Sequence, residues 1–134
     1  MGPKAPRRRR AGTQTRWSFG DDESALVDYA WYGVNTADVN ENHAHQVGLK
    51  KPNAFGLYDM HGNVFEWCHD YLVHSYYKRS AEKDPTGPVA GSWRVLRGGS
   101  WCYNSHVTRS AYRRRGEPHY RNIINGFRLV RELD

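Results

Sequence analysis

The sequence predicts a single α+β domain with a high loop content. Short runs that alternate apolar and polar residues, as strands do, are separated by long polar stretches rich in Gly, Pro and Asn. The chain has 13 Gly and 5 Trp but few Leu, which argues against a helix bundle or a coiled coil. Its 134 residues suit one domain, and a content of 38% hydrophobic and 13% aromatic residues is typical of a folded chain.

The first half of the chain predicts one short strand and one helical turn. Residues 16–34 begin with an aromatic strand, which a turn at residues 20–22 ends. Ser24 is expected to cap a helical turn that runs to Tyr29. Residues 35–53 are polar without a period and predict a long loop. The densest apolar segment, residues 54–73, follows this loop.

The second half predicts two short strands between loops. Residues 74–93, rich in Lys, Gly and Pro, predict a loop. Residues 94–97 alternate as a strand does and are followed by two glycines that end it. Residues 102–125 predict another loop, and residues 127–131 a closing strand. So much loop is expected only where the loops are functional or held by a metal.

The formal net charge of +6 is unevenly distributed. Residues 1–10 carry five cations and no acids and predict a disordered basic tail, whose arginines could contact nucleic acid or remain solvated. Residues 11–93 have a net charge of −5, and residues 94–134 have +6. Because the middle is acidic, the arginines of the last third are expected to pair with its carboxylates, and nucleic-acid binding is not expected. The arginines concerned are Arg109, Arg113, Arg121 and Arg128, whereas Arg114 and Arg115 are the better candidates for an exposed patch.

Cysteine and histidine spacing predicts no metal site. Cys68 and Cys102 form neither a disulfide framework nor a zinc pattern, so free thiols are expected, with a single bridge between them left open. His43 with His45, and His69 with His74, are candidate ligands, but solvated or hydrogen-bonded imidazoles are the preferred interpretation. No apolar run reaches about 20 residues, and no apolar stretch follows the basic start, so neither a membrane span nor a signal peptide is predicted and a cytoplasmic location is expected.

Four segments resemble signatures of one family, in order and spacing. Residues 53–67 (NAFGLYDMHGNVFEW) resemble a signature of the formylglycine-generating enzyme (sulfatase-modifying factor) family, and residues 94–101 (RVLRGGSW), 109–113 (RSAYR) and 126–130 (GFRLV) resemble others. The resemblance implies a C-type-lectin-like fold of the formylglycine-generating-enzyme type. It implies that residues 11–134 form this domain, as a C-terminal portion that lacks the family's N-terminal part.

The resemblance also implies a structural calcium site. In the family, this site uses main-chain oxygens at the positions that match His61, Gly62 and Val64, together with the carboxylate of Glu66. Gly62 and the following Asn63 suit a tight turn that presents carbonyls on one side, and calcium takes 6–8 oxygen ligands. An ion pair between Glu66 and a nearby arginine is the alternative.

The family's oxidative chemistry needs a pair of thiols to hold copper(I), and this pair is not matched. The resemblance places the two thiols at Tyr103 and Thr108, and Cys102 is one residue out of register. A threonine hydroxyl is a hard ligand and does not replace a thiolate on copper(I). Copper is therefore not expected, no catalytic residue is assigned, and Cys102 is only a weak candidate for a reactive thiol. Whether the chain is an enzyme stays open, and a non-catalytic role is favoured.

The stretch between these framework motifs resembles the variable proteins of diversity-generating retroelements, which use this lectin-like fold to display ligand-binding surfaces. Where family members often have asparagines, this chain has a chemically mixed set, predicted to bind a ligand: Cys102, Tyr103, Ser105, His106, Val107, Arg114, Gly116, Glu117, His119, Tyr120, Ile123 and Ile124. Exposed loop positions vary at little cost to a core, and Tyr and His are typical of binding surfaces.

The sequence thus favours a non-catalytic domain that binds an unknown protein or small-molecule ligand through residues 102–124. A formylglycine-generating oxidoreductase and an inactive or truncated paralogue are the alternatives. Self-association is left open.

Overall fold

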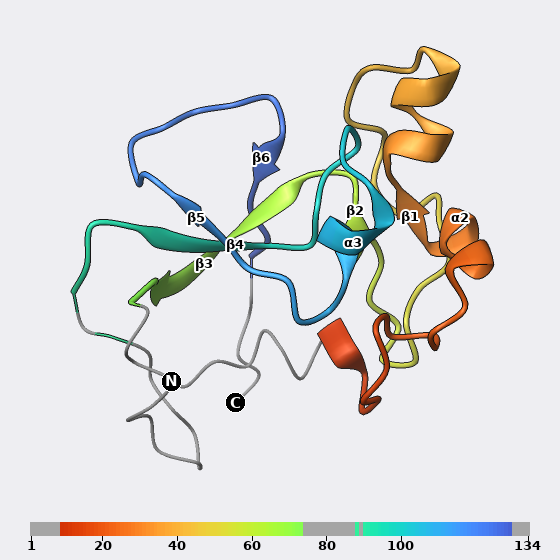
Figure 1. The fold of residues 1–134 in the computed structure, drawn as a ribbon, viewed down its shortest axis with the longest axis horizontal. Helices are drawn as coiled ribbons and strands as arrows, with labels where there is room; N and C mark the ends of the chain where they lie inside the picture. The colour runs from red at the N-terminus through yellow and green to blue at the C-terminus, as the bar shows by residue number, and fades with distance from the viewer. Residues whose placement is uncertain (1–8, 74–87, 89, 130–134) are drawn as a thin grey trace.

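A four-stranded mixed sheet forms one side of the molecule, and a two-stranded sheet with short helices forms the other (Figure 1). The structure, a computed structural model, describes residues 9–73, 88 and 90–129. The larger sheet has the strand order β5-β4-β3-β6. Its strands are β3 (Phe65–Tyr71), β4 (Arg94–Arg97), β5 (Arg114–Gly116) and β6 (Asn125–Gly126). The smaller sheet pairs β1 (Ala30–Trp31) with β2 (His61–Gly62) in parallel. The predicted class, mixed helix and strand with much loop, is confirmed.

Strand β4 is the element that the sequence predicts best. It pairs antiparallel with β3 on one side and with β5 on the other. Both of its central residues, Val95 and Leu96, are 2% exposed. The strand ends at Gly98 and Gly99, whose φ angles of +98° and +79° lie in the left-handed region that favours glycine.

The helical turns of the first half are short. They are η1 (Glu23–Ala25), α2 (Leu26–Tyr29), η2 (Gly33–Asn35) and η3 (Ala37–Val39). The predicted Ser24 cap is wrong. Asp22 is the N-cap of η1, because its carboxylate accepts from the Ser24 amide at 2.9 Å and from the Ser24 hydroxyl at 2.7 Å. The predicted loop over residues 35–53 contains η3 and the end of η2.

The last third is more ordered than predicted. The expected loop over residues 102–125 contains α3 (Ser105–Thr108) and β5. The closing strand is also misplaced: Asn125 and Gly126 pair with β3, whereas Phe127 and Leu129 are 75% and 86% exposed and lie outside any strand. Residues 130 and 131, and most of the loop predicted over residues 74–93, lie outside the described residues.

Two apolar clusters are joined by buried polar groups. The first cluster consists of Phe65, Leu96, Trp101, Val107 and Ile124. The second consists of Trp17, Leu26, Ala30 and Tyr32. Between them the Thr108 hydroxyl accepts from the Trp17 indole at 3.0 Å, and the Thr108 carbonyl lies 2.9 Å from Nδ1 of His61. The clusters therefore form one connected interior.

The turn at Gly62 and Asn63 fixes how the smaller sheet meets the rest of the chain. Their φ angles are +74° and +62°, and a Cβ at Gly62 would lie 2.1 Å from the Trp31 carbonyl oxygen. The Asn63 side chain bonds both the amide and the carbonyl of His45, at 2.8 and 3.1 Å. The left-handed backbone predicted here is present as a bend after β2, and the Asn63 side chain anchors the preceding loop. No helix among the described residues has the length and apolar character needed to cross a bilayer.

Candidate ligand-binding site

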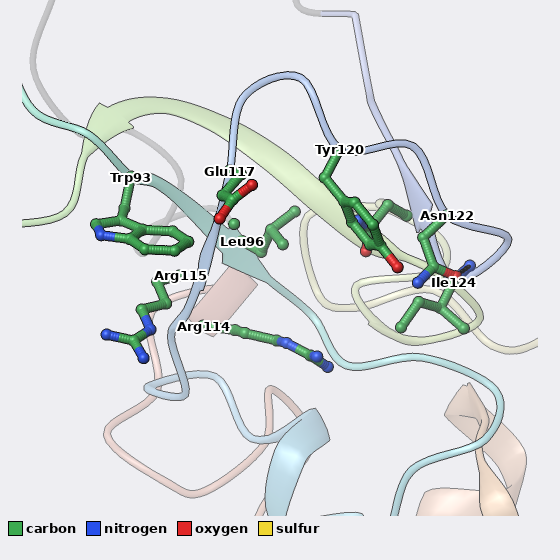
Figure 2. A pocket seen from close by; sticks show the side chains of 10 residues that line it. Trp93, Leu96, Arg114, Arg115, Glu117, Tyr120, Asn122 and Ile124 are labelled. Carbon is green, nitrogen blue, oxygen red and sulfur yellow. Dashed lines mark hydrogen bonds between the residues drawn. The ribbon is translucent and has the colours of Figure 1, made fainter.

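A pocket of about 440 Å³ lies where β4, β5 and the loop after β5 meet (Figure 2). This volume lies within the range of small-molecule sites, roughly 300–1,000 Å³. Aromatic, aliphatic, cationic and amide groups share the lining, which comprises Trp93, Leu96, Arg114, Arg115, Gly116, Glu117, Tyr120, Asn122, Ile124 and Asn125.

Strand pairing and local turns build this pocket. Arg114 pairs with Leu96, so β5 lies directly against β4. A Cβ at Gly116 would lie 2.7 Å from Leu96 and 2.6 Å from Trp67, so a larger residue here would displace these side chains. The loop after β5 folds on itself through the Tyr120 amide, which donates to the Glu117 carbonyl at 3.0 Å. The loop returns to the sheet where the Ile124 carbonyl accepts from the Phe65 amide at 2.7 Å.

Arg114 lines the pocket and is half-buried. Its guanidinium carbon lies 5.2 Å from the ring centres of both Phe65 and Tyr103. One nitrogen donates to the Tyr103 hydroxyl at 2.5 Å. In the described part of the chain no carboxylate pairs with Arg114.

Arg115 and Glu117 are exposed charges of opposite sign in the same lining. The Arg115 guanidinium carbon lies 4.9 Å over the Trp93 ring, a cation–π contact. Figure 2 shows Glu117 next to Trp93, whereas Arg114 extends toward the side where Tyr120 and Ile124 lie. No ion pair among the described residues joins Glu117 to either arginine.

The structure brings together only part of the set predicted to bind a ligand. Arg114, Gly116, Glu117, Tyr120 and Ile124 line the pocket. Cys102, Ser105, His106, His119 and Ile123 are exposed or half-exposed and do not line it.

Two members of the predicted set have roles in packing. Val107 is 8% exposed and belongs to the first apolar cluster, so its prediction as a surface position is wrong. The physical reason is that α3 turns this side chain inward. Tyr103 is half-buried and packs edge-on against Phe65, with ring centres 5.4 Å apart.

Half of the residues that line the pocket were not predicted from the sequence to bind a ligand. Trp93, Leu96, Arg115, Asn122 and Asn125 line the pocket but were not in the predicted set. Trp93 and Leu96 come from the other side of the β4–β5 pairing, which the sequence does not reveal. The only signal for Arg115 was its expected exposure, which is confirmed.

The positions that match the family's thiol pair carry structural side chains. The Thr108 hydroxyl donates to the Ser105 carbonyl at 2.8 Å, accepts from Trp17, and is fully buried. Tyr103 packs under Arg114. Both cysteines are free: Cys102 is exposed, and burial raises the pKa of the Cys68 thiol, which keeps it protonated.

Glu66 is held by two arginines. Its Oε2 lies 3.4 Å from Arg9, and its Oε1 lies 2.6 Å from Arg128. The expected pairing of Arg128 with the acidic middle is therefore confirmed, whereas Arg109 bonds His106 instead of a carboxylate. Arg9 corrects the predicted tail boundary: it is 2% exposed and belongs to the folded domain. Burial lowers the pKa of Arg9 to about 10, against the attraction of Glu66.

In this arrangement Glu66, the one carboxylate of the implied calcium site, is engaged by ion pairs. Both carboxylate oxygens of Glu66 face guanidinium groups, which repel a cation. His61 and Gly62 pair in β2, and the Gly62 amide bonds the Gly98 carbonyl at 2.6 Å. In the described residues no three His, Cys, Asp or Glu side chains form a metal-binding group.

The remaining histidine candidates lie apart from the pocket. His45 stacks on Trp31 with ring centres 3.9 Å apart, and its Nε2 lies 2.7 Å from Glu41. His43 is tilted against His45 at 4.7 Å. His69 is exposed, and His74 lies outside the described residues.

The fold and the position of the motifs are those of a C-type-lectin-like domain of the formylglycine-generating-enzyme type. The chain belongs to the sulfatase-modifying factor family. Residues 5–133 match the family's domain, described as the Sulfatase-modifying factor enzyme 1-like domain. The resemblance found in the sequence is thereby confirmed.

Three similar proteins show how far the relation extends. The formylglycine-generating enzyme of Streptomyces coelicolor is 39% identical over 129 residues, which cover 89% of this chain and 41% of that protein. Serine/threonine-protein kinase pkn1 of Chlamydia pneumoniae is 44% identical over 85 residues, covering 62% of this chain and 14% of that protein. The solved structure of Treponema denticola variable protein 1 has a TM-score of 0.79 and 40% identity, covering 89% of this chain and 41% of that one. The chain thus spans less than half the length of each of these three.

Proposed function

We propose that this chain is a non-catalytic ligand-binding domain of its family. The pocket between β4, β5 and the loop after β5 takes a protein or small-molecule ligand, as the variable surface of a diversity-generating retroelement protein would. The observation that carries the proposal is a formed pocket with five residues of the mixed set in its lining, on a framework whose thiol positions are structural.

Two further observations support a binding role. The pocket lining is mixed: aromatic and aliphatic residues lie beside charged and amide groups, which can orient a bound ligand. The similarity to a protein whose name is variable protein 1 agrees with the resemblance that the mixed residues suggested. In this interpretation, intact strands hold the backbone while Glu117 and Tyr120 vary without cost to the core.

A ligand screen tests the proposal. A library of small molecules and short peptides is screened against the chain, and each hit is titrated by calorimetry against two variants. Tyr120→Ala removes a pocket side chain, and His119→Ala removes its exposed neighbour outside the lining. We expect Tyr120→Ala to weaken binding at least about tenfold, because aromatic anchors carry much of the binding energy. Equal affinity in both variants would refute the pocket as the site.

Whether the ligand-binding residues are diversified by a retroelement can be tested in the DNA beside the gene. A near-identical template repeat that differs only at adenines, next to a reverse-transcriptase gene, is the expected finding. Without such a repeat, the same pocket would belong to a non-catalytic paralogue of fixed sequence.

A formylglycine-generating oxidoreductase is the second candidate, favoured by the 39% identity to the Streptomyces coelicolor enzyme. A peptide with one cysteine is incubated with the chain, copper and oxygen, and its mass is followed. We expect no loss of the thiol, because Tyr103 and Thr108 offer no second thiolate to accompany Cys102. Turnover would refute the non-catalytic proposal.

A further inference from the structure

The pocket has an excess of positive charge that nothing in the described part of the chain neutralises. Arg114 and Arg115 both line it, and no ion pair among the described residues involves either. Glu117 is the one acid in the lining, so the lining carries a net charge of +1. Arg114 is half-buried and so partly desolvated, and a ligand anion would give its guanidinium a charge-assisted hydrogen bond.

The two arginines differ in how they are held. Arg115 is exposed and lies over Trp93 at the rim. Arg114 is half-buried, stacked near Phe65 and Tyr103, and held by the Tyr103 hydroxyl. A guanidinium has five N–H donors, and within the described residues Arg114 uses one of its nitrogens, on the Tyr103 hydroxyl. With one edge on Tyr103, Arg114 keeps a fixed orientation and retains donors for a second acceptor.

The rest of the lining selects the ligand's uncharged part. The exposed ring of Tyr120 and the half-buried ring of Trp93 supply aromatic surface, whereas Leu96 and Ile124 are buried and add little. Figure 2 shows Tyr120 and Ile124 on the side toward which Arg114 extends. The amides of Asn122 and Asn125 add neutral donors and acceptors.

We propose that the pocket recognises an aromatic carboxylate, with its carboxylate on Arg114 and its ring against Tyr120. This inference rests on the proposed binding function and names its ligand class. A monoanion is favoured over a phosphate dianion, because Glu117 in the lining repels the second charge.

Calorimetry with three probes tests the ligand class. The probes are 3-phenylpropionate, its neutral amide 3-phenylpropionamide, and phenyl phosphate. We expect the carboxylate to bind at least about tenfold more tightly than the amide, since a hydrogen bond between two charged groups is roughly twice as strong as one between neutral groups. Equal affinity for carboxylate and amide, or tighter binding of phenyl phosphate, would overturn the assignment.

Variants localise the charge recognition. Arg114→Gln should weaken 3-phenylpropionate at least about tenfold and leave 3-phenylpropionamide unchanged. Arg121→Gln, an exposed arginine outside the lining, is the matched control and should bind as the parent does. Arg114→Lys keeps the charge without the fork and should retain part of the affinity, so it separates lost charge from lost packing. Circular dichroism melting confirms that each variant is folded before it is titrated.

The outcomes separate this inference from the binding function on which it rests. If neutral library ligands bind and Tyr120→Ala abolishes their binding, but Arg114→Gln has no effect on 3-phenylpropionate, the carboxylate assignment is wrong and the binding site stands. If neither the three probes nor any library hit depends on Tyr120 or Arg114, both proposals are refuted.

Discussion

At the scale of single residues, His61 shows how a buried polar side chain joins distant segments. It is 2% exposed, and its Nε2 accepts from the Ser18 amide at 3.2 Å. Its Nδ1 must then carry the proton that it donates to the Thr108 carbonyl. Both ring nitrogens of the neutral imidazole are therefore hydrogen-bonded. Burial, and secondarily the charge of Arg9, lower the pKa of His61 from 6.5 to about 3.

Acid should therefore destabilise the fold through His61. Between pH 6.5 and about 3 the unfolded chain binds a proton that the folded chain excludes, so stability is complete above this window and falls as the pH is lowered through it. One such proton contributes a slope of about 1.4 kcal/mol per pH unit. Urea denaturation at several pH values should give a shallower acid slope for His61→Asn than for the parent. The exposed-site control His119→Asn should keep the parental slope. An unchanged slope in His61→Asn would contradict this assignment.

Glu66 should stabilise the fold through its arginines. In Glu66→Gln the Arg9 guanidinium stays buried without a carboxylate, so unfolding free energy measured in urea should fall by about 3 kcal/mol. Glu117→Gln, at an exposed position, should change it little.

The response of the melting temperature to calcium is a second test of the role of Glu66. Calcium and chelators should leave the melting temperature of the parent unchanged, because a ligand that does not bind cannot stabilise by mass action. A calcium-dependent rise that disappears in Glu66→Gln would instead favour the metal site that the family resemblance implied.

At the scale of elements, the sequence predicted what short-range patterns control. Strand β4 shows a local alternation and a double glycine, so both its place and its end were predicted. Strands β5 and β6 span three and two residues, too few for a period to appear, and they form because β4 and β3 offer partners. The pairing of Arg9 with Glu66, 57 residues apart, likewise leaves no periodic signal in the sequence.

The junction of β1 with β2 depends on a glycine at Gly62. Gly62→Ala would place a Cβ 2.1 Å from the Trp31 carbonyl oxygen in addition to its positive φ. The control Gly56→Ala has a similar φ of +73° with nothing near its Cβ, so it isolates the conformational cost of ~1–2 kcal/mol. We expect Gly62→Ala to lose at least about 2 kcal/mol more than this control in urea denaturation. Equal losses would mean that the close approach at Trp31 does not constrain the fold.

At the scale of the whole molecule, one connected interior supports both the strands and the pocket. The two apolar clusters, joined through Thr108 and His61, hold the strands, and the loop after β5 closes the pocket against β4. The family and its fold could be inferred from four motifs, because motif residues such as Gly62 and Gly99 are required by close backbone contacts. The pocket could be predicted only in part, because Trp93 and Leu96 enter it through long-range strand pairing.

The most direct test of the binding account is NMR of the ¹⁵N-labelled chain titrated with 3-phenylpropionate or with the tightest library hit. The predicted result is a set of shifts at Trp93 and at residues 114–125, while the indole signal of Trp17, buried and bonded to Thr108, stays in place. Shifts confined to residues 41–50, or to Cys102 and its neighbours, would contradict the claim that this pocket is the ligand site.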